Sequence, residues 1–188
     1  MVTPPAANII FSFSKRKFLM FGLTPDQEDL YRRIVDGPRA QTSGISPILD
    51  SSGNLVGPFK SFLISPKLGS ILEQLGRHLR YGHTISAIDK ELSILRVSRH
   101  VESKFEWLAH VDVARGLGVS EQELDSIWSL DSEPLSIYVR CVDEIIKPGD
   151  KKSSLSSLGL LDEEKRMHLI ALVGYYVLIA NLMHEFGE

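Results

Sequence analysis

The chain has 188 residues, 43% of them hydrophobic and 24% charged, as expected for one globular domain whose core needs no disulfide. Its formal net charge of -3 argues against a nucleic-acid-binding surface. A single cysteine, Cys141, excludes an internal disulfide and a CxxC motif and fits a reducing, cytoplasmic compartment.

Residues 1–23 are expected to form an N-terminal arm in front of a helical domain of residues 24–188. The arm contains no Asp or Glu, but it does contain Lys15, Arg16 and Lys17. A basic, acid-poor segment is typical of a transit peptide, so organellar targeting is an alternative to an arm that docks on another subunit. No stretch reaches ~20 apolar residues, the closest being residues 168–183, so we expect no membrane span.

Helical signals dominate from residue 24 onward. The run Thr24-Pro25-Asp26-Gln27 predicts a helix start, and that helix should stop at Gly37-Pro38. Residues 37–58 are rich in Gly, Ser and Pro and predict a long loop of the kind that often covers a pocket. Caps, glycine stops and apolar spacing predict further helices over residues 65–81, 86–100, 102–115, 120–130, 134–146 and 162–185, with a polar loop over 149–159. No segment alternates as a strand does, so the predicted class is all-α.

One polar stripe interrupts these apolar helices. Ser103, Glu106 and His110 are spaced i, i+3 and i+7, and Glu91 lies on the preceding helix. We expect the two carboxyl groups and the imidazole to share a sheltered pocket. There His110 would transfer protons, Glu106 would orient its ring, and Glu91 would be a second acid or base if burial raised its pKa. The alternative is an ordinary Glu–His pair on a helix surface, and spacing alone favours that alternative.

Cationic side chains gather where the helix over residues 65–81 ends. Arg77 or Arg80 would grip a substrate carboxylate in a bidentate manner. The alternative is that these cations merely complement the helix C-terminus, which is the more common arrangement. The six histidines form no HExxH motif, and no GxGxxG motif is present, so no metal or nucleotide site is predicted.

The motifs DKELSILRV (89–97), FEWLAH (105–110) and GLGVSEQEL (116–124) resemble the carboxymuconolactone decarboxylase family. Its superfamily also contains the alkylhydroperoxidase D proteins. The motif VGPFK (56–60) and the closing segment 169–186 extend the resemblance over residues 24–186.

The hydroperoxidase branch of this family carries a glutamate followed by Cys-x-x-Cys-x-x-x-His. If its histidine is placed on His110, its glutamate falls on Glu91 and its two cysteines fall on Ser103 and Glu106. Both redox cysteines are therefore absent, and neither replacement can form a disulfide. The resemblance thus implies the decarboxylase branch.

That branch implies an all-helical subunit, assembled as a trimer or a dimer of trimers, that uses no metal or organic cofactor. Its substrate would be a small organic acid or lactone, and decarboxylation would leave a carbanion or dienolate for His110 or a neutral Glu91 to protonate. Substrate-binding roles are expected for Ser103, Trp107, Arg77 and Tyr175. Two alternatives stay open: a thiol-dependent hydroperoxidase that uses Cys141, and a non-catalytic oligomeric binding protein on the same fold.

Overall fold

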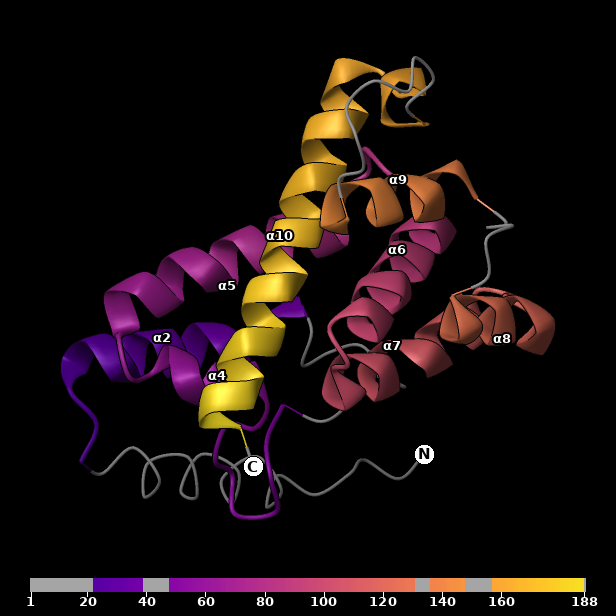
Figure 1. The fold of residues 1–188 in the computed structure, drawn as a ribbon. Coiled ribbons are helices and arrows are strands. Elements are labelled where there is room, and N and C mark those ends of the chain that lie inside the picture. The colour runs from indigo at the N-terminus through magenta and orange to yellow at the C-terminus, as the bar shows by residue number, and fades with distance from the viewer. Residues whose placement is uncertain (1–21, 39–47, 131–135, 148–156, 188) are drawn as a thin grey trace, which may run out of the picture. The chain divides into compact units, whose positions relative to one another are not determined.

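The computed structural model describes residues 22–38, 48–130, 136–147 and 157–187 (Figure 1). These residues form helices, and the only pairing of strand type among them is an isolated bridge between Leu49 and Leu55. The all-α class is therefore confirmed. Nearly all of the predicted arm, and residues 39–47 of the predicted loop, lie outside the described residues.

The described chain divides into two compact units, of which the first contains residues 22–38 and 48–72. Helix α2 (Pro25–Val35) starts with the predicted capping box, in which Thr24 accepts from the Gln27 N–H and Gln27 accepts from the Thr24 N–H. Helix α4 (Pro58–Phe62) was not predicted. It begins after Gly57, whose φ of 62° suits glycine, and Pro58 occupies its first turn.

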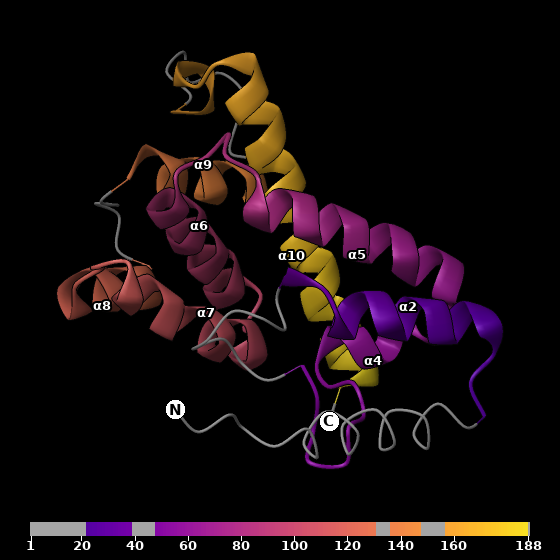
Figure 2. The same ribbon diagram turned by 180° about the vertical axis from the view of Figure 1, so that it is seen from behind.

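The second unit contains the described residues from 73 onward and is built around helix α6 (Ala87–His100). This helix packs against α7 (Lys104–Gly116), α8 (Glu121–Ser129), α9 (Ile137–Ile146) and α10 (Glu163–Phe186). Figure 2 shows α6 among its partners from behind. Every residue from 90 to 98 is buried, so α6 carries polar side chains into the core as well as apolar ones.

Helix α5 (Pro66–Tyr81) begins in the first unit and ends in the second, before Gly82 as predicted. Helix α7 starts two residues later than predicted, because Glu102 has a left-handed φ of 54° and cannot continue a helix. A short 3-10 helix, η1 (Ser157–Leu160), occupies the end of the predicted polar loop.

Helix α10 is long and apolar enough, by length and composition alone, to cross a membrane, which the sequence analysis did not expect. Core helices of soluble proteins pass the same test. Its buried residues follow helical spacing: Leu169, Leu172, Val173, Tyr176, Ile179 and Ala180. The opposite stripe contains Met167 and is exposed, so α10 buries one face within this chain and leaves the other uncovered.

Candidate functional site

The three predicted catalytic side chains lie together inside the second unit. Nδ1 of His110 lies 2.6 Å from Oε2 of Glu91, and Nε2 of the same ring lies 3.4 Å from Oε2 of Glu106. The side chain of His110 has no exposed surface, and those of Glu91 and Glu106 are 7% and 5% exposed. The structure thus brings together one imidazole and two carboxyl groups that are almost wholly removed from water.

Local helix geometry explains this convergence. Glu106 and His110 are four residues apart on α7, so they lie one turn apart on one face. The chain turns at Glu102, between α6 and α7, and the two helices pack together, so the face of α7 with Glu106 and His110 meets the buried segment of α6 that holds Glu91. The backbone N–H of Ser103 donates to the Ser98 carbonyl at 2.8 Å and secures the junction.

Two further residues, Arg80 and Tyr176, reach His110. Arg80 was expected only as the alternative to Arg77 for binding a carboxylate, and Tyr176 was not predicted. Nη1 of Arg80 lies 3.2 Å from Nε2 of His110, and Oη of Tyr176 lies 3.4 Å from the same atom. The rings of His110 and Tyr176 pack edge to face with centroids 5.3 Å apart. The buried stripe of α10, at residues 169, 172, 173, 176 and 179, would have singled out Tyr176.

The hydrogen bonds of His110 fix its tautomer. A guanidinium has no acceptor, so Arg80 donates to Nε2 and the ring proton lies on Nδ1, directed at Glu91. Burial raises the pKa of Glu91, but the hydrogen bond from His110 and the charges of Arg80 and Lys90 outweigh burial and leave this pKa below its ordinary value. Glu91 is therefore an ionised acceptor, so the condition on which it would act as a second acid or base, a pKa raised by burial, is not met.

Lys90 holds the end of α5 beside the site. Its ammonium group is buried and donates to the carbonyl oxygens of Arg80 and Gly82 at 2.8 and 2.7 Å. Burial lowers the pKa of Lys90, and the charge of Arg80 lowers it further against the opposing effect of Glu91. A pocket of about 10 Å³ adjoins Lys90 and has room for about one water molecule.

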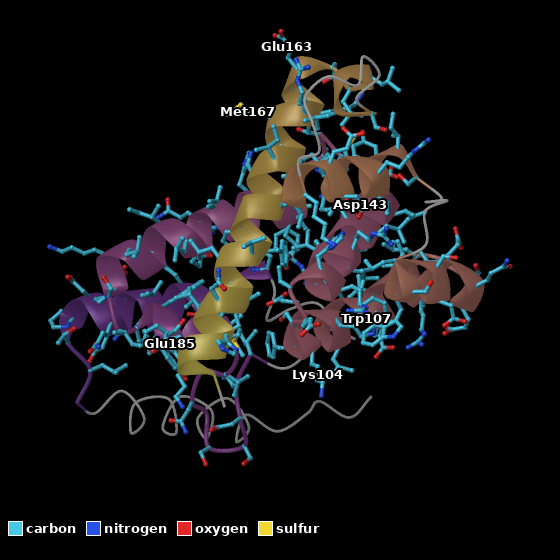
Figure 3. All side chains as sticks on the ribbon, in the orientation of Figure 1. Lys104, Trp107, Asp143, Glu163, Met167 and Glu185 are labelled. Carbon is cyan, nitrogen blue, oxygen red and sulfur yellow. The ribbon has the colours of Figure 1, made fainter. Side chains whose placement is uncertain are left out.

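Ser103 and Trp107, two of the predicted substrate-binding residues, make structural contacts away from His110. Ser103 is the N-cap of α7, where its hydroxyl accepts from the Glu106 N–H at 3.4 Å, so it does not share the helical stripe of Glu106 and His110. Trp107 packs edge to face on Trp128 of α8 with centroids 4.7 Å apart (Figure 3).

Neighbours of the other two predicted residues, rather than those residues themselves, contact His110. Arg77 is half exposed and pairs with Glu73 at 3.5 Å one turn earlier on α5, whereas Arg80 reaches the imidazole. The hydroxyl of Tyr175 lies against Gly76, whereas Tyr176 faces His110.

A second polar cluster joins α6 to α9. Arg96 grips Asp143 in a bidentate pair, with both N–O distances 2.7 Å, and Nε2 of His100 lies 2.6 Å from Asp143 (Figure 3). Burial raises the pKa of Asp143, but the hydrogen bonds from Arg96 and His100 outweigh it and the pKa is lowered. This cluster holds α6 and α9 together, and the buried guanidinium of Arg96 is paired with the carboxylate of Asp143.

Cys141 lies buried in the core of α9. Burial and the charge of Glu144 raise the pKa of its thiol to about 11, so it is protonated at neutral pH. Among the described residues, no group of three or more His, Cys, Asp and Glu side chains is arranged to hold a metal ion.

Comparisons of the chain with protein-family models, with curated proteins and with solved structures found no match. The resemblance to the carboxymuconolactone decarboxylase family therefore stays a prediction from the quoted residues.

Proposed function

We propose that this chain is a cofactor-free acid–base enzyme that acts on a small organic acid or lactone. The observation that supports the proposal most is the 2.6 Å hydrogen bond between Glu91 and His110, which is buried and leaves Nε2 as the basic atom of the ring. A carboxylate that fixes the tautomer of a histidine is the arrangement by which many enzymes prepare a base. The fold that we propose with it is the helical bundle of the alkylhydroperoxidase D type, with the reaction of a carboxymuconolactone decarboxylase-like lyase.

In this proposal Nε2 of His110 takes a proton from a carbon acid beside a carbonyl group and returns it after the substrate has rearranged. In a decarboxylation, the bond from carbon to the carboxylate breaks and carbon dioxide leaves. The electron pair then remains as a dienolate. Nε2 of His110 takes up a proton from solvent before this step, and the resulting imidazolium transfers that proton to carbon. Glu106 lies 3.4 Å from Nε2 and is the second proton acceptor.

Tyr176 is the donor for the developing oxyanion. Burial raises the pKa of its hydroxyl well above the ordinary range, so the group stays protonated and can donate a hydrogen bond.

The test is turnover of γ-lactone carboxylic acids, followed by release of carbon dioxide. His110→Ala should lower kcat by roughly 10²–10⁴-fold, the usual contribution of a positioned acid–base group. Glu91→Gln should lower kcat with little change in KM, because Glu91 orients the base and does not contact the substrate. The control is Glu185→Gln at the exposed end of α10, where activity should be unchanged (Figure 3). Full activity in His110→Ala would remove this histidine from the reaction.

One observation favours a second candidate, a non-catalytic binding protein. His110 is completely enclosed, so a substrate reaches Nε2 only if a covering side chain moves. A folded chain that binds small acids but turns none of them over would support this candidate.

The thiol-dependent hydroperoxidase is disfavoured because Cys141 is buried and its thiol is protonated at neutral pH. Hydroperoxide consumption that stops when Cys141 is alkylated would restore this candidate.

A homo-oligomer, either a trimer or a dimer of trimers, is part of the proposal. It is supported by an exposed apolar stripe on α10, where Met167 is 72% exposed and Ile170 is 46% exposed (Figure 3). Gly174, one turn after Ile170, has open space above it, so a neighbouring helix can approach closely. Ile170→Glu should lower the sedimentation coefficient to that of a smaller assembly, and an unchanged value would remove this face from the interface.

A further inference from the structure

The guanidinium of Arg80 differs from the other buried guanidinium of the second unit. Arg96 is paired with both oxygens of Asp143. In the described part of the chain, no carboxylate lies within ion-pair distance of Arg80, and its hydrogen bonds go to Nε2 of His110 and to the hydroxyl of Tyr176. A guanidinium has five donors in a planar fork that fits a carboxylate, so Arg80 has donors left for an anion.

Arg80 also occupies the accessible edge of the site. The four other members of the network, Glu91, Glu106, His110 and Tyr176, are buried, whereas Arg80 keeps a small part of its surface exposed. Any small molecule that approaches Nε2 from solvent through this network therefore meets the guanidinium first.

A second donor near Arg80 lacks a partner. The hydroxyl of Tyr81, the next residue on α5, is buried and makes no hydrogen bond to the described residues. Tyr81 is one of the groups that act electrostatically on Arg80, together with Tyr176 and Glu91. Buried hydroxyl groups are nearly always satisfied, so the hydroxyl of Tyr81 needs a partner that the described residues do not supply.

We propose that Arg80 and Tyr81 bind the carboxylate of a small organic anion, and that this binding uncovers the base. Without ligand, Nη1 of Arg80 occupies the lone pair of Nε2 at 3.2 Å, so the nitrogen cannot accept a proton from a substrate. A carboxylate that takes the fork of Arg80 and the hydroxyl of Tyr81 draws the guanidinium away. Nε2 then keeps only its longer contact with the hydroxyl of Tyr176, at 3.4 Å, beside the bound anion. The inference rests on the proposed function for the chemistry that follows, and it names the substrate class as small carboxylates.

Binding of benzoate to the full-length chain tests the inference without any turnover. Calorimetry should give saturable binding that sodium chloride at equal ionic strength does not reproduce. Arg80→Gln should weaken affinity roughly tenfold or more, as expected for loss of a charge-assisted pair, and Tyr81→Phe should weaken it about threefold. Arg77→Gln is the matched control on the same helix, and its affinity should stay within about twofold of wild type. If Arg80→Gln does not fold, Arg80→Lys, which keeps the charge but loses the fork, should still bind more weakly than wild type.

The uncovering step has its own readout, the ¹⁵N signal of His110 Nε2 in chain labelled at histidine. Benzoate should shift this signal in wild type, and Arg80→Gln alone should shift it in the same direction. The inference is overturned if benzoate does not bind, if Arg77→Gln weakens binding in place of Arg80→Gln, or if benzoate binds and the Nε2 signal does not move. Failure of the proposed function is separate: full turnover in His110→Ala would refute the enzyme while benzoate still bound through Arg80.

Discussion

Replacement of Glu91 tests whether the buried hydrogen bond to His110 stabilises the fold as well as the tautomer. Glu91→Gln keeps the size of the side chain and an oxygen for the Nδ1 proton, but it removes the charge. A net hydrogen bond to a charged group contributes about 1.5–3 kcal/mol and one between neutral groups about 0.5–1.5 kcal/mol. We therefore expect Glu91→Gln to lower the free energy of unfolding by about 1–2 kcal/mol.

Glu91→Ala should cost more, because it leaves a cavity and an Nδ1–H without an acceptor. Removal of one partner of a buried, charged pair typically costs about 3–5 kcal/mol. Urea unfolding at pH 7 measures both variants, with Glu185→Gln as a surface control that should stay within about 0.5 kcal/mol of wild type. An alanine variant as stable as the glutamine variant would refute the geometry of this hydrogen bond.

The difference in free energy of unfolding between wild type and Glu91→Gln should depend on pH, and the direction of that dependence follows from the pKa of Glu91. The pKa of Glu91 is lower in the folded chain than its ordinary value of 4.5, so the unfolded chain binds the proton more tightly. The stabilisation that ionised Glu91 gives the fold is complete when the pH is above the pKa of the unfolded chain. It is lost as the pH falls through the pKa of Glu91 in the folded chain. The stability gap between wild type and Glu91→Gln should therefore be constant between about pH 7 and 5 and should shrink in more acidic solution. A gap that widens on acidification would show that the pKa is shifted in the other direction.

Three further predictions concern positions outside the network. Gly76→Ala would drive a methyl group into the ring of Tyr175, so it should destabilise the chain by about 1–2 kcal/mol; in a Tyr175→Leu background it should instead stabilise, because alanine is the better helix former. Unchanged stability of Gly76→Ala in wild type would contradict that contact. Ser103→Ala should cost about 1 kcal/mol in urea unfolding, as loss of an N-cap does, with no further loss of turnover per folded molecule. Cys141 should react with a thiol reagent only when the chain unfolds, and rapid reaction of the native protein would contradict its burial.

Helix positions could be predicted from the sequence because their signals are local. The capping boxes at Thr24 and Ser120 and the glycine after Tyr81 fixed three helix ends to within a residue. The convergence of Glu91, Glu106 and His110 was expected from their helical spacing together with the family resemblance, whereas spacing alone favoured a pair on the helix surface. The start of α7 did not, because the left-handed φ of Glu102 is a property of the turn and not of glutamate as a residue type.

The rest of the network could not be read from spacing because it comes from distant parts of the chain. Arg80 and Tyr176 meet His110 only through the packing of three helices, over separations of 30 and 66 residues. Arg77 and Arg80 are equally plausible on a helical wheel, and only the fold distinguishes the arginine that faces the imidazole. For Tyr176 the buried period of α10 was available, but the neighbouring Tyr175 offers the same chemistry and masks the difference.

The charged and polar side chains buried around His110 indicate that this network has a function besides stabilising the fold. Two carboxyl groups, an imidazole, a guanidinium and a buried ammonium lie where apolar side chains would fold at least as well, because burying charge is costly even when it is paired. The Arg96–Asp143 pair shows how this chain compensates a cation that only holds helices together. Nε and Nη2 of Arg96 meet the two carboxylate oxygens, and Nη1 meets the backbone carbonyls of Ser126 and Ile127. Arg80 departs from that pattern, since it donates to a neutral nitrogen beside an unpaired hydroxyl. Simultaneous replacement of Glu91, Glu106 and His110, together with Arg80 and Lys90, by leucine or methionine leaves no charge of the network without its partners. Stability should therefore be equal or higher while activity is lost, and a large loss of stability in that variant would assign the network to folding alone.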